Sequence, residues 1–307
     1  MQPTLSRSSQ SSQAYLQDPR NNDVQVYVNG EFVHRDNAVV SIFDSGYVCG
    51  DGVWEGLRLV NGRLIALDAH LDRLFEGAAT IQLDIGHSRE ALTDILYKTL
   101  AVNGMTDGAH IRLMITRGKK HTPNQDPRFI ISGATIVCVA EYKVVDTAAK
   151  KRGLTLFTST YRTSTPDVFD LRLNSHSRLN LIQALLQALQ AGADEALMLD
   201  PHGFVASCNS TNFFIVRRGE LWTSSGRYCF NGITRQTLIN LAEANGLKVR
   251  AQDFTLAEAL TADEAFVTGT LAGITPVKAL DGRPFNAEHR PVTEQLSRWY
   301  EAYLHAQ

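Results

Sequence analysis

Apolar and polar positions repeat with two different periods along this chain, and the period separates predicted strands from predicted helices. Val24 to Val33 alternates around Asn29-Gly30, which predicts a β-hairpin with a tight turn. After a strand-like segment at 171–173, apolar residues recur at helical spacing, at Leu179, Ile182, Leu186 and Leu189, and predict a long amphipathic helix that ends near Gly192.

The same two periods predict the other elements. Further strands are expected over 38–43, 53–60, 63–67, 109–116, 135–141, 154–157, 196–199, 204–206, 213–216, 221–223 and 264–267. Further helices are expected over 67–79, 89–101, 235–245 and 256–262, and at the C-terminal end, which carries Trp299 and Tyr303. Asn61-Gly62 is the expected turn of a second hairpin. Strands and helices therefore mix along the whole chain.

Composition narrows the class of protein. The 307 residues are 44% hydrophobic and 20% charged, with a formal net charge of -2, which gives no electrostatic case for a nucleic-acid or membrane partner. No apolar run reaches about 18 residues, and residues 1–22 are polar without the order of a secretory signal. The four cysteines lack CxxC spacing and are expected to be reduced thiols, and no metal site is predicted. A soluble cytoplasmic protein is predicted.

Five motifs occur in one order: GDGVWEGLR (50–58), LDAHLDRL (67–74), AGADEALMLD (191–200), NGITR (231–235) and TGTLAGITPV (268–277). Together they resemble the class IV pyridoxal-phosphate aminotransferases of fold type IV, which include branched-chain and D-amino-acid aminotransferases. The resemblance extends from about Val26 to Pro284. It implies a homodimer that acts on a small amino acid or amine and a 2-oxo acid.

The resemblance also implies a two-domain α/β (α+β) fold. The expected divisions are a flexible N-terminal arm over 1–22, a small α/β domain over 23–143, a linker over 144–153 and a large α/β domain over 154–307. The ligand pocket is expected at the domain interface.

A cup for the cofactor phosphate is the first functional feature that the resemblance implies. Arg73, in LDAHLDRL, matches the arginine that grips the phosphate, since a guanidinium binds a dianion in a bidentate manner. The start of the helix at NGITR is a ready anion site. The implied cofactor contacts are Arg73, Ser207, Phe230, Gly232, Ile233, Thr234, Gly269 and Thr270.

The substrate side is less sharply defined. Trp54 and Arg58 fall where the family keeps an aromatic and a polar or cationic residue, and core and rim packing is the alternative for both. Arg112 and the basic loop Arg117–Lys120 could meet a substrate carboxylate, or the loop could be a solvated surface. The implied substrate contacts are Cys49, Trp54, Arg58, Arg112, Leu271 and Ala272.

Two positions depart from the family at the chemistry itself. The lysine that binds the cofactor covalently and carries the proton corresponds to Asn174, or to Leu173 after a slip of one residue, and no lysine lies between Lys151 and Lys248. The glutamate that keeps the pyridine nitrogen protonated corresponds to Ser207, whose hydroxyl carries no charge. Two departures together indicate a natural divergent branch.

Three hypotheses follow. In the first, the protein binds pyridoxal phosphate, without covalent attachment if need be, and another base transfers the proton: Lys119 or Lys120 from the basic loop, or His176 and Arg178 close to Asn174. In the second, it catalyses another reaction with noncovalent cofactor or none, through Cys49, Cys208 or His176. In the third, it is a non-catalytic subunit of the same fold. The family name predicts an aminotransferase; the residues predict a non-standard route.

Overall fold

The computed structural model describes residues 11–286 and 289–306, which form two compact units. The N-terminal unit contains residues 16–144 and 173–178, and the C-terminal unit contains residues 11–15, 145–172 and the described residues from 179 onward. The chain passes from one unit to the other at Val144–Val145, close to the predicted linker. The segment 173–178 belongs to the N-terminal unit although its neighbours in the chain do not, which the sequence did not anticipate.

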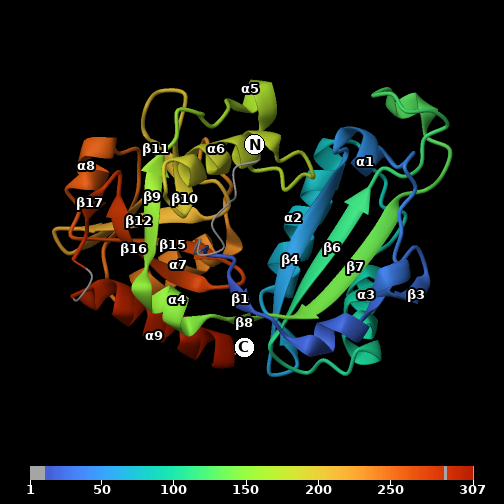
Figure 1. Ribbon diagram of the computed structural model, residues 1–307, viewed down its shortest axis with the longest axis horizontal. Helices are drawn as coiled ribbons and strands as arrows, with labels where there is room; N and C mark the ends of the chain where they lie inside the picture. Colours follow the sequence, from blue (N-terminus) through green and yellow to red (C-terminus); the bar gives the residue numbers. More distant parts are fainter. Residues whose placement is uncertain (1–10, 287–288, 307) are drawn as a thin grey trace. The chain divides into compact units, whose positions relative to one another are not determined.

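The N-terminal unit is an antiparallel sheet with two helices packed on one face (Figure 1). Six strands lie in the order β3-β2-β7-β6-β4-β5, and apolar residues of the long helices α2 and α3 fill the core against this sheet. The bounds are η1 Pro19–Asp23, β2 Gln25–Val28, β3 Glu31–His34, η2 Arg35–Asn37, α1 Ser45–Cys49, β4 Gly52–Val60, β5 Arg63–Leu64, α2 Leu67–Thr80, α3 Arg89–Val102, β6 Ala109–Thr116, η3 Pro127–Phe129 and β7 Thr135–Tyr142.

Both predicted hairpin turns of this unit are confirmed. Asn29 and Gly30 have φ angles of 48° and 104°, and Asn61 and Gly62 have φ angles of 48° and 79°. Such left-handed pairs match the twist of the strands that they join, and asparagine and glycine adopt them at the lowest cost. Local sequence therefore sets these two turns.

The predicted strand over 38–43 is wrong. These residues form no strand, and Val39 and Ile42 are 75% and 67% exposed. Their β-branched side chains favour a strand only where a neighbouring strand offers hydrogen bonds and a packed face. The next residues begin the short helix α1, whose first turn Asp44 caps by accepting a hydrogen bond from Gly46 N.

The C-terminal unit is built on a mixed sheet of nine strands (Figure 1). Its order is β11-β10-β9-β16-β15-β12-β13-β14, with β17 paired to β16. The bounds are α4 Thr147–Arg152, β9 Leu154–Thr158, α5 Pro166–Phe169, α6 Leu179–Gln190, β10 Glu195–Leu199, β11 Val205–Cys208, β12 Asn212–Arg217, β13 Glu220–Thr223, α7 Ile233–Ala244, β14 Val249–Ala251, α8 Leu256–Leu260, β15 Glu264–Gly269, β16 Gly273–Leu280, β17 Arg283–Pro284 and α9 Pro291–Ala306.

Helix α6 forms at the predicted place but buries a different face. Leu179, Ile182 and Leu186 of the predicted apolar stripe are 69%, 49% and 46% exposed. Ala184 and Ala188 are the residues that pack against Ala196 and Met198 of β10. Small side chains let the helix approach the strand closely, so the larger stripe is left outside this packing.

The chain before β2 is ordered from residue 11 on, whereas the sequence predicted a flexible arm over 1–22; residues 1–10 lie outside the described part. The short strands β1 (Tyr15–Leu16) and β8 (Val144–Val145) pair with each other. Asn21 is buried and exchanges hydrogen bonds with the backbone of Tyr142. No helix within the described residues is long and apolar enough to cross a membrane.

Candidate active site

The N-terminal unit holds a buried carboxylate surrounded by basic groups. Glu55 of β4 is fully buried and accepts hydrogen bonds from Arg73 at 2.7 and 2.6 Å and from His70 Nδ1 at 2.7 Å. His70 and Arg73 are three residues apart on α2, so both side chains point from one helix face to the strand. Burial alone would raise the pKa of Glu55, but the bonds from Arg73 and His70 lower it below its usual value.

This arrangement gives Arg73 a partner that the sequence did not predict. The guanidinium expected to grip the phosphate makes a two-bonded ion pair with Glu55, and its side chain is 16% exposed. Such bidentate pairs hold both side chains in one orientation and are stronger than pairs joined by a single hydrogen bond. The phosphate role of Arg73 remains a prediction, and within the unit its observed partner is Glu55.

Asn174, at the position expected for lysine, joins the same network. The segment around it runs along β4: Trp54 N donates to Asn174 O at 2.9 Å, and His176 N donates to Gly52 O at 3.0 Å. The Asn174 amide nitrogen donates to the carbonyl of Trp54 and lies 3.4 Å from Glu55 Oε1, and Arg178 donates to its amide oxygen. The amide is 4% exposed. It is a structural bridge rather than a nucleophile.

A cationic face lies on the side of the sheet away from the helices. Trp54 and Arg112, on neighbouring strands, stack with the guanidinium carbon 3.7 Å from the ring centre, and Arg178 lies 5.2 Å from the same ring. Arg112 is exposed and makes no hydrogen bond or ion pair within the described residues. Arg58 lies on the same face of the sheet as Trp54, because every second side chain along a strand points to the same face and the two residues are four apart.

The protonation of this region follows from burial and crowding of positive charge. Burial, and then repulsion by Arg112 and Arg73, lowers the pKa of Arg178 to about 10, so the guanidinium stays charged at neutral pH. Burial, followed by Arg112, lowers the pKa of His176 to about 4. The His176 ring is therefore neutral at neutral pH, and its buried Nε2 has no hydrogen-bond partner among the described residues.

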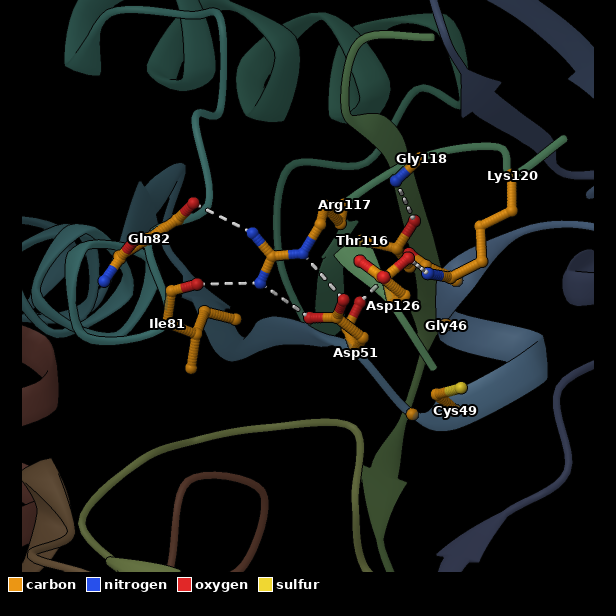
Figure 2. A network of polar contacts seen from close by, with 12 residues as sticks. Gly46, Cys49, Asp51, Ile81, Gln82, Thr116, Arg117, Gly118, Lys120 and Asp126 are labelled. Carbon is orange, nitrogen blue, oxygen red and sulfur yellow. Dashed lines mark hydrogen bonds and ion pairs between the residues drawn. The ribbon is translucent and has the colours of Figure 1, made fainter. Parts of the chain in front are cut away.

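The basic loop after β6 is held in place by other contacts (Figure 2). Arg117 makes a two-bonded ion pair with Asp51, at 2.7 and 2.9 Å, and donates to the carbonyls of Ile81 and Gln82. Lys120 is 1% exposed and its ammonium donates to the Asp126 carbonyl at 3.0 Å. Arg117 and Lys120 are thus structural, and Lys119 is exposed. None of these contacts leads to Asn174.

The two cysteines considered from the sequence lie in different surroundings. Cys49, which Figure 2 labels, is exposed, and its Sγ lies 3.5 Å from the Asn124 carbonyl oxygen. Cys208 is buried, and burial together with the Glu195 carboxylate raises the pKa of its thiol well above the usual value. A buried neutral thiol is a poor nucleophile. The described residues contain no group of three or more histidine, cysteine or acidic side chains that could hold a metal ion.

The C-terminal unit gathers the predicted phosphate contacts around the start of α7. This helix begins at Ile233 after Gly232, and no side chain caps its first N–H groups. Asn212 fixes the entry: its amide donates to Phe230 O at 2.6 Å and its oxygen accepts from Gly232 N at 3.2 Å. A Cβ on Gly232 would lie 2.3 Å from that oxygen, so a larger residue there would displace the Asn212 side chain.

Strand β15 brings the other predicted phosphate contacts next to the start of α7. Thr268 is paired with Asn212 across the sheet, and Gly269 follows it at the strand end, with Thr270 in the next turn. The Thr268 hydroxyl is buried and has no hydrogen-bond partner among the described residues. N–H groups without a side-chain cap at a helix start, beside the Thr234 hydroxyl, are donors of the kind that bind a phosphate group.

The segment that carries Ser207, where the resemblance places a glutamate, lies beside a buried carboxylate. Ser207 is 6% exposed, and Glu195 of β10 accepts hydrogen bonds from Ser12 N at 2.8 Å and the Thr211 hydroxyl at 3.2 Å. Burial raises the pKa of Glu195. In the turn after Thr270, Leu271 and Ala272 are buried, and Lys150 donates to the Ala272 carbonyl at 2.7 Å. Glu195 and Lys150 were not predicted.

Known proteins resemble this chain over most of its length. A model of the family described as amino-transferase class IV matches residues 52–280. The chain is 38% identical over 286 residues to branched-chain-amino-acid aminotransferase-like protein 2 of Arabidopsis thaliana, covering 92% of this chain but 51% of that protein. It therefore spans about half the length of that relative. It is 39% identical over 264 residues to a putative branched-chain-amino-acid aminotransferase of Methanocaldococcus jannaschii, covering 86% and 90% of the two chains.

Solved structures show the same similarity. The branched-chain aminotransferase of Thermoproteus uzoniensis with norvaline superposes with a TM-score of 0.83 at 29% identity, covering 92% of this chain and 95% of that one. A second branched-chain amino acid aminotransferase, solved with pyridoxamine 5'-phosphate, superposes with a TM-score of 0.84 at 27% identity, covering 92% and 94%.

Proposed function

Because the chain belongs to the class IV aminotransferases, we propose that it is an aminotransferase that binds pyridoxal phosphate without a covalent bond to residue 174. It would transfer an amino group between a small amino acid or amine and a 2-oxo acid. The uncapped start of α7, fixed by Asn212 and lined by Gly232 and Thr234, carries this proposal. The cofactor, when bound, supplies an aldehyde and an electron-accepting ring.

The residues of the chain have separate roles in this proposal. The cup of the C-terminal unit binds the phosphate dianion through N–H and hydroxyl donors. In the N-terminal unit, Arg112 and Arg178 offer charged guanidinium groups to a substrate carboxylate beside Trp54. His176 accepts and returns a proton at Nε2, since it is the neutral base next to Asn174.

The hydrogen-bond partners and the pKa values of the candidate proton carriers favour one of them. Lys120 is committed to the Asp126 carbonyl, and Arg178 keeps its proton at neutral pH because its pKa is about 10. The pKa of His176, about 4, leaves it available as an acceptor. We therefore take His176 as the proton carrier of the proposed enzyme.

Titration with pyridoxal phosphate tests the cofactor proposal. We expect saturable changes in the cofactor absorption spectrum, full recovery of colourless protein on dialysis, and no mass increase after borohydride reduction, since residue 174 carries no amine. Mass spectrometry of the reduced protein is the measurement. A reduced adduct mapped to any lysine would contradict noncovalent binding, and the absence of any spectral change would contradict cofactor binding itself.

We further propose that the protein is a homodimer that uses an apolar patch of the N-terminal unit. The patch consists of Val39, Val40, Ile42, Tyr47, Phe129 and Ile131, which are 42% to 77% exposed. Lys120 N donates to Phe43 O and Ile131 N donates to Lys119 O, so the two patch segments are held side by side. Exposed apolar patches of this kind mark protein–protein interfaces.

Ile42→Lys should convert the dimer to a monomer, since a lysine in the apolar patch must lose its hydration when the second copy docks. Light scattering coupled to gel filtration measures the mass of each species. Val168→Lys is the matched control, because Val168 is 76% exposed in the other unit. A monomeric wild-type protein, or an Ile42→Lys variant that stays dimeric, would contradict this interface.

A further inference from the structure

Arg235 is a buried guanidinium without a carboxylate beside it. The residue is 5% exposed, its Nη2 donates to the Ser224 carbonyl at 2.8 Å, and its Nε has no partner among the described residues. Burial lowers the pKa of Arg235, and the ionisable group that faces it is Cys229, whose thiol is kept neutral because burial raises its pKa. A buried cation that lacks an anion destabilises the fold.

The position of Arg235 suggests what compensates this charge. It is the third residue of α7, one turn or less from the N–H groups of Ile233 and Thr234, which no side chain caps. The nearby Thr268 hydroxyl, 2% exposed, is a second buried polar group without a partner among the described residues, and it pairs in register with Asn212, which holds Gly232. An anion bound at the start of α7 would give such unsatisfied groups a compensating charge and an acceptor.

Arg73 differs from Arg235 in this respect. Its guanidinium already faces Glu55 through two hydrogen bonds, so its charge is compensated within the protein. The positive charge of Arg250 is likewise compensated by a neighbouring carboxylate, that of Glu220. The charge of Arg235 has no such balance, and this distinguishes it from the arginine that the sequence motif singles out.

We propose that Arg235 is a positioning residue that supplies the balancing positive charge for a phosphate dianion bound at the start of α7. This inference rests on the proposed cofactor function, whose phosphate would occupy that place. Arg235 acts on the phosphate through the electrostatic field of its guanidinium, and it holds the 224–231 loop by its hydrogen bond to the Ser224 carbonyl. It does not contact the reacting atoms. The ligand-free protein then carries an uncompensated buried charge, and binding of the dianion relieves it.

Arg235→Met in the full-length protein tests the proposal, because methionine is unbranched and uncharged. We expect the dissociation constant for pyridoxal phosphate to rise by about 10- to 50-fold, as loss of one charge a few ångströms from a dianion predicts. We also expect the ligand-free variant to unfold at the same temperature as the wild type or at a higher one. Fluorescence titration and thermal unfolding with and without pyridoxal phosphate measure both quantities.

Controls separate charge from structure. Arg250→Met removes an arginine that Glu220 balances on the surface of the same unit and should leave the affinity unchanged. Arg235→Lys keeps the charge and should retain most of the affinity. Binding of pyridoxal, which lacks the phosphate, should be equally weak in wild type and Arg235→Met.

The outcomes are distinct. If wild-type protein binds neither pyridoxal phosphate nor inorganic phosphate, the proposed function fails and this inference with it. If wild type binds and Arg235→Met binds equally well, only the inference is overturned. An Arg235→Met variant that cannot fold, or that loses as much stability without ligand as with it, also overturns the inference, since Arg235 would then be a structural residue.

Discussion

Glu55→Gln should lower the free energy of unfolding of the N-terminal unit by about 3–5 kcal/mol, because it leaves buried basic groups without their anion. Glu55 is the carboxylate that both Arg73 and His70 contact, and Asn174 lies 3.4 Å from it. Glutamine keeps the shape but presents an NH₂ group to one of these donors. Urea denaturation followed by tryptophan fluorescence measures the change.

Glu31→Gln is the control for this change, since Glu31 is an exposed carboxylate on a strand of the same unit. Its expected effect is within about 0.5 kcal/mol. A loss below about 1 kcal/mol in Glu55→Gln would contradict the view that this network holds the unit together.

The same carboxylate has a predictable pH dependence. Its pKa in the folded protein is lowered below the ordinary value of 4.5, so its contribution is complete above pH 4.5 and is lost as the pH falls through the lower folded value. Wild-type stability should therefore decline in acid over this window. The Glu55→Gln variant should show a weaker decline there, because the group that titrates is absent.

His176→Asn should reduce kcat by about 10²- to 10⁴-fold, the usual worth of a positioned general acid–base group. Its pKa of about 4 means that the wild-type rate should fall as the pH drops through about 4 and be independent of this group from about pH 5 to 8. Steady-state kinetics with a small amino acid and a 2-oxo acid, over that pH range, measure the effect.

A matched control and a binding measurement keep this prediction specific. His121→Asn changes an exposed histidine of the same unit and should leave kcat within about twofold. The affinity of His176→Asn for pyridoxal phosphate should equal that of wild type, because the phosphate cup lies in the other unit. A variant that keeps more than about one fifth of the wild-type kcat would remove His176 from the proton transfer.

Elements set by local rules could be predicted from the sequence, and elements set by partners could not. The hairpin turns at Asn29-Gly30 and Asn61-Gly62 follow from residues that tolerate positive φ. The prediction of a strand over 38–43 was wrong because β-branched residues favour an extended backbone but do not show that a neighbouring strand is there to pair with it. The prediction of which face of α6 is buried was wrong. The apolar period identifies a stripe of large residues, but it cannot show that the small residues Ala184 and Ala188 pack against β10 instead.

The candidate site divides in the same manner. The helix start beside NGITR and the strand end at Gly269 were predictable from their motifs, and their role as a phosphate cup stays a prediction. The pairing of Arg73 with Glu55 was not, because the partners lie eighteen residues apart and both belonged to motifs already given another role. Arg235 was quoted within a motif, yet its lack of a carboxylate is a property of three-dimensional surroundings that no spacing encodes.

The excursion of residues 173–178 into the N-terminal unit affects how this protein can be divided. Their backbone covers an edge of β4, from which Trp54 and Gly52 make hydrogen bonds. A recombinant fragment ending at Val144 would expose that edge as an open template for intermolecular strand pairing. The N-terminal unit is therefore discontinuous in the gene, and its autonomous folding depends on a peptide encoded within the sequence of its neighbour.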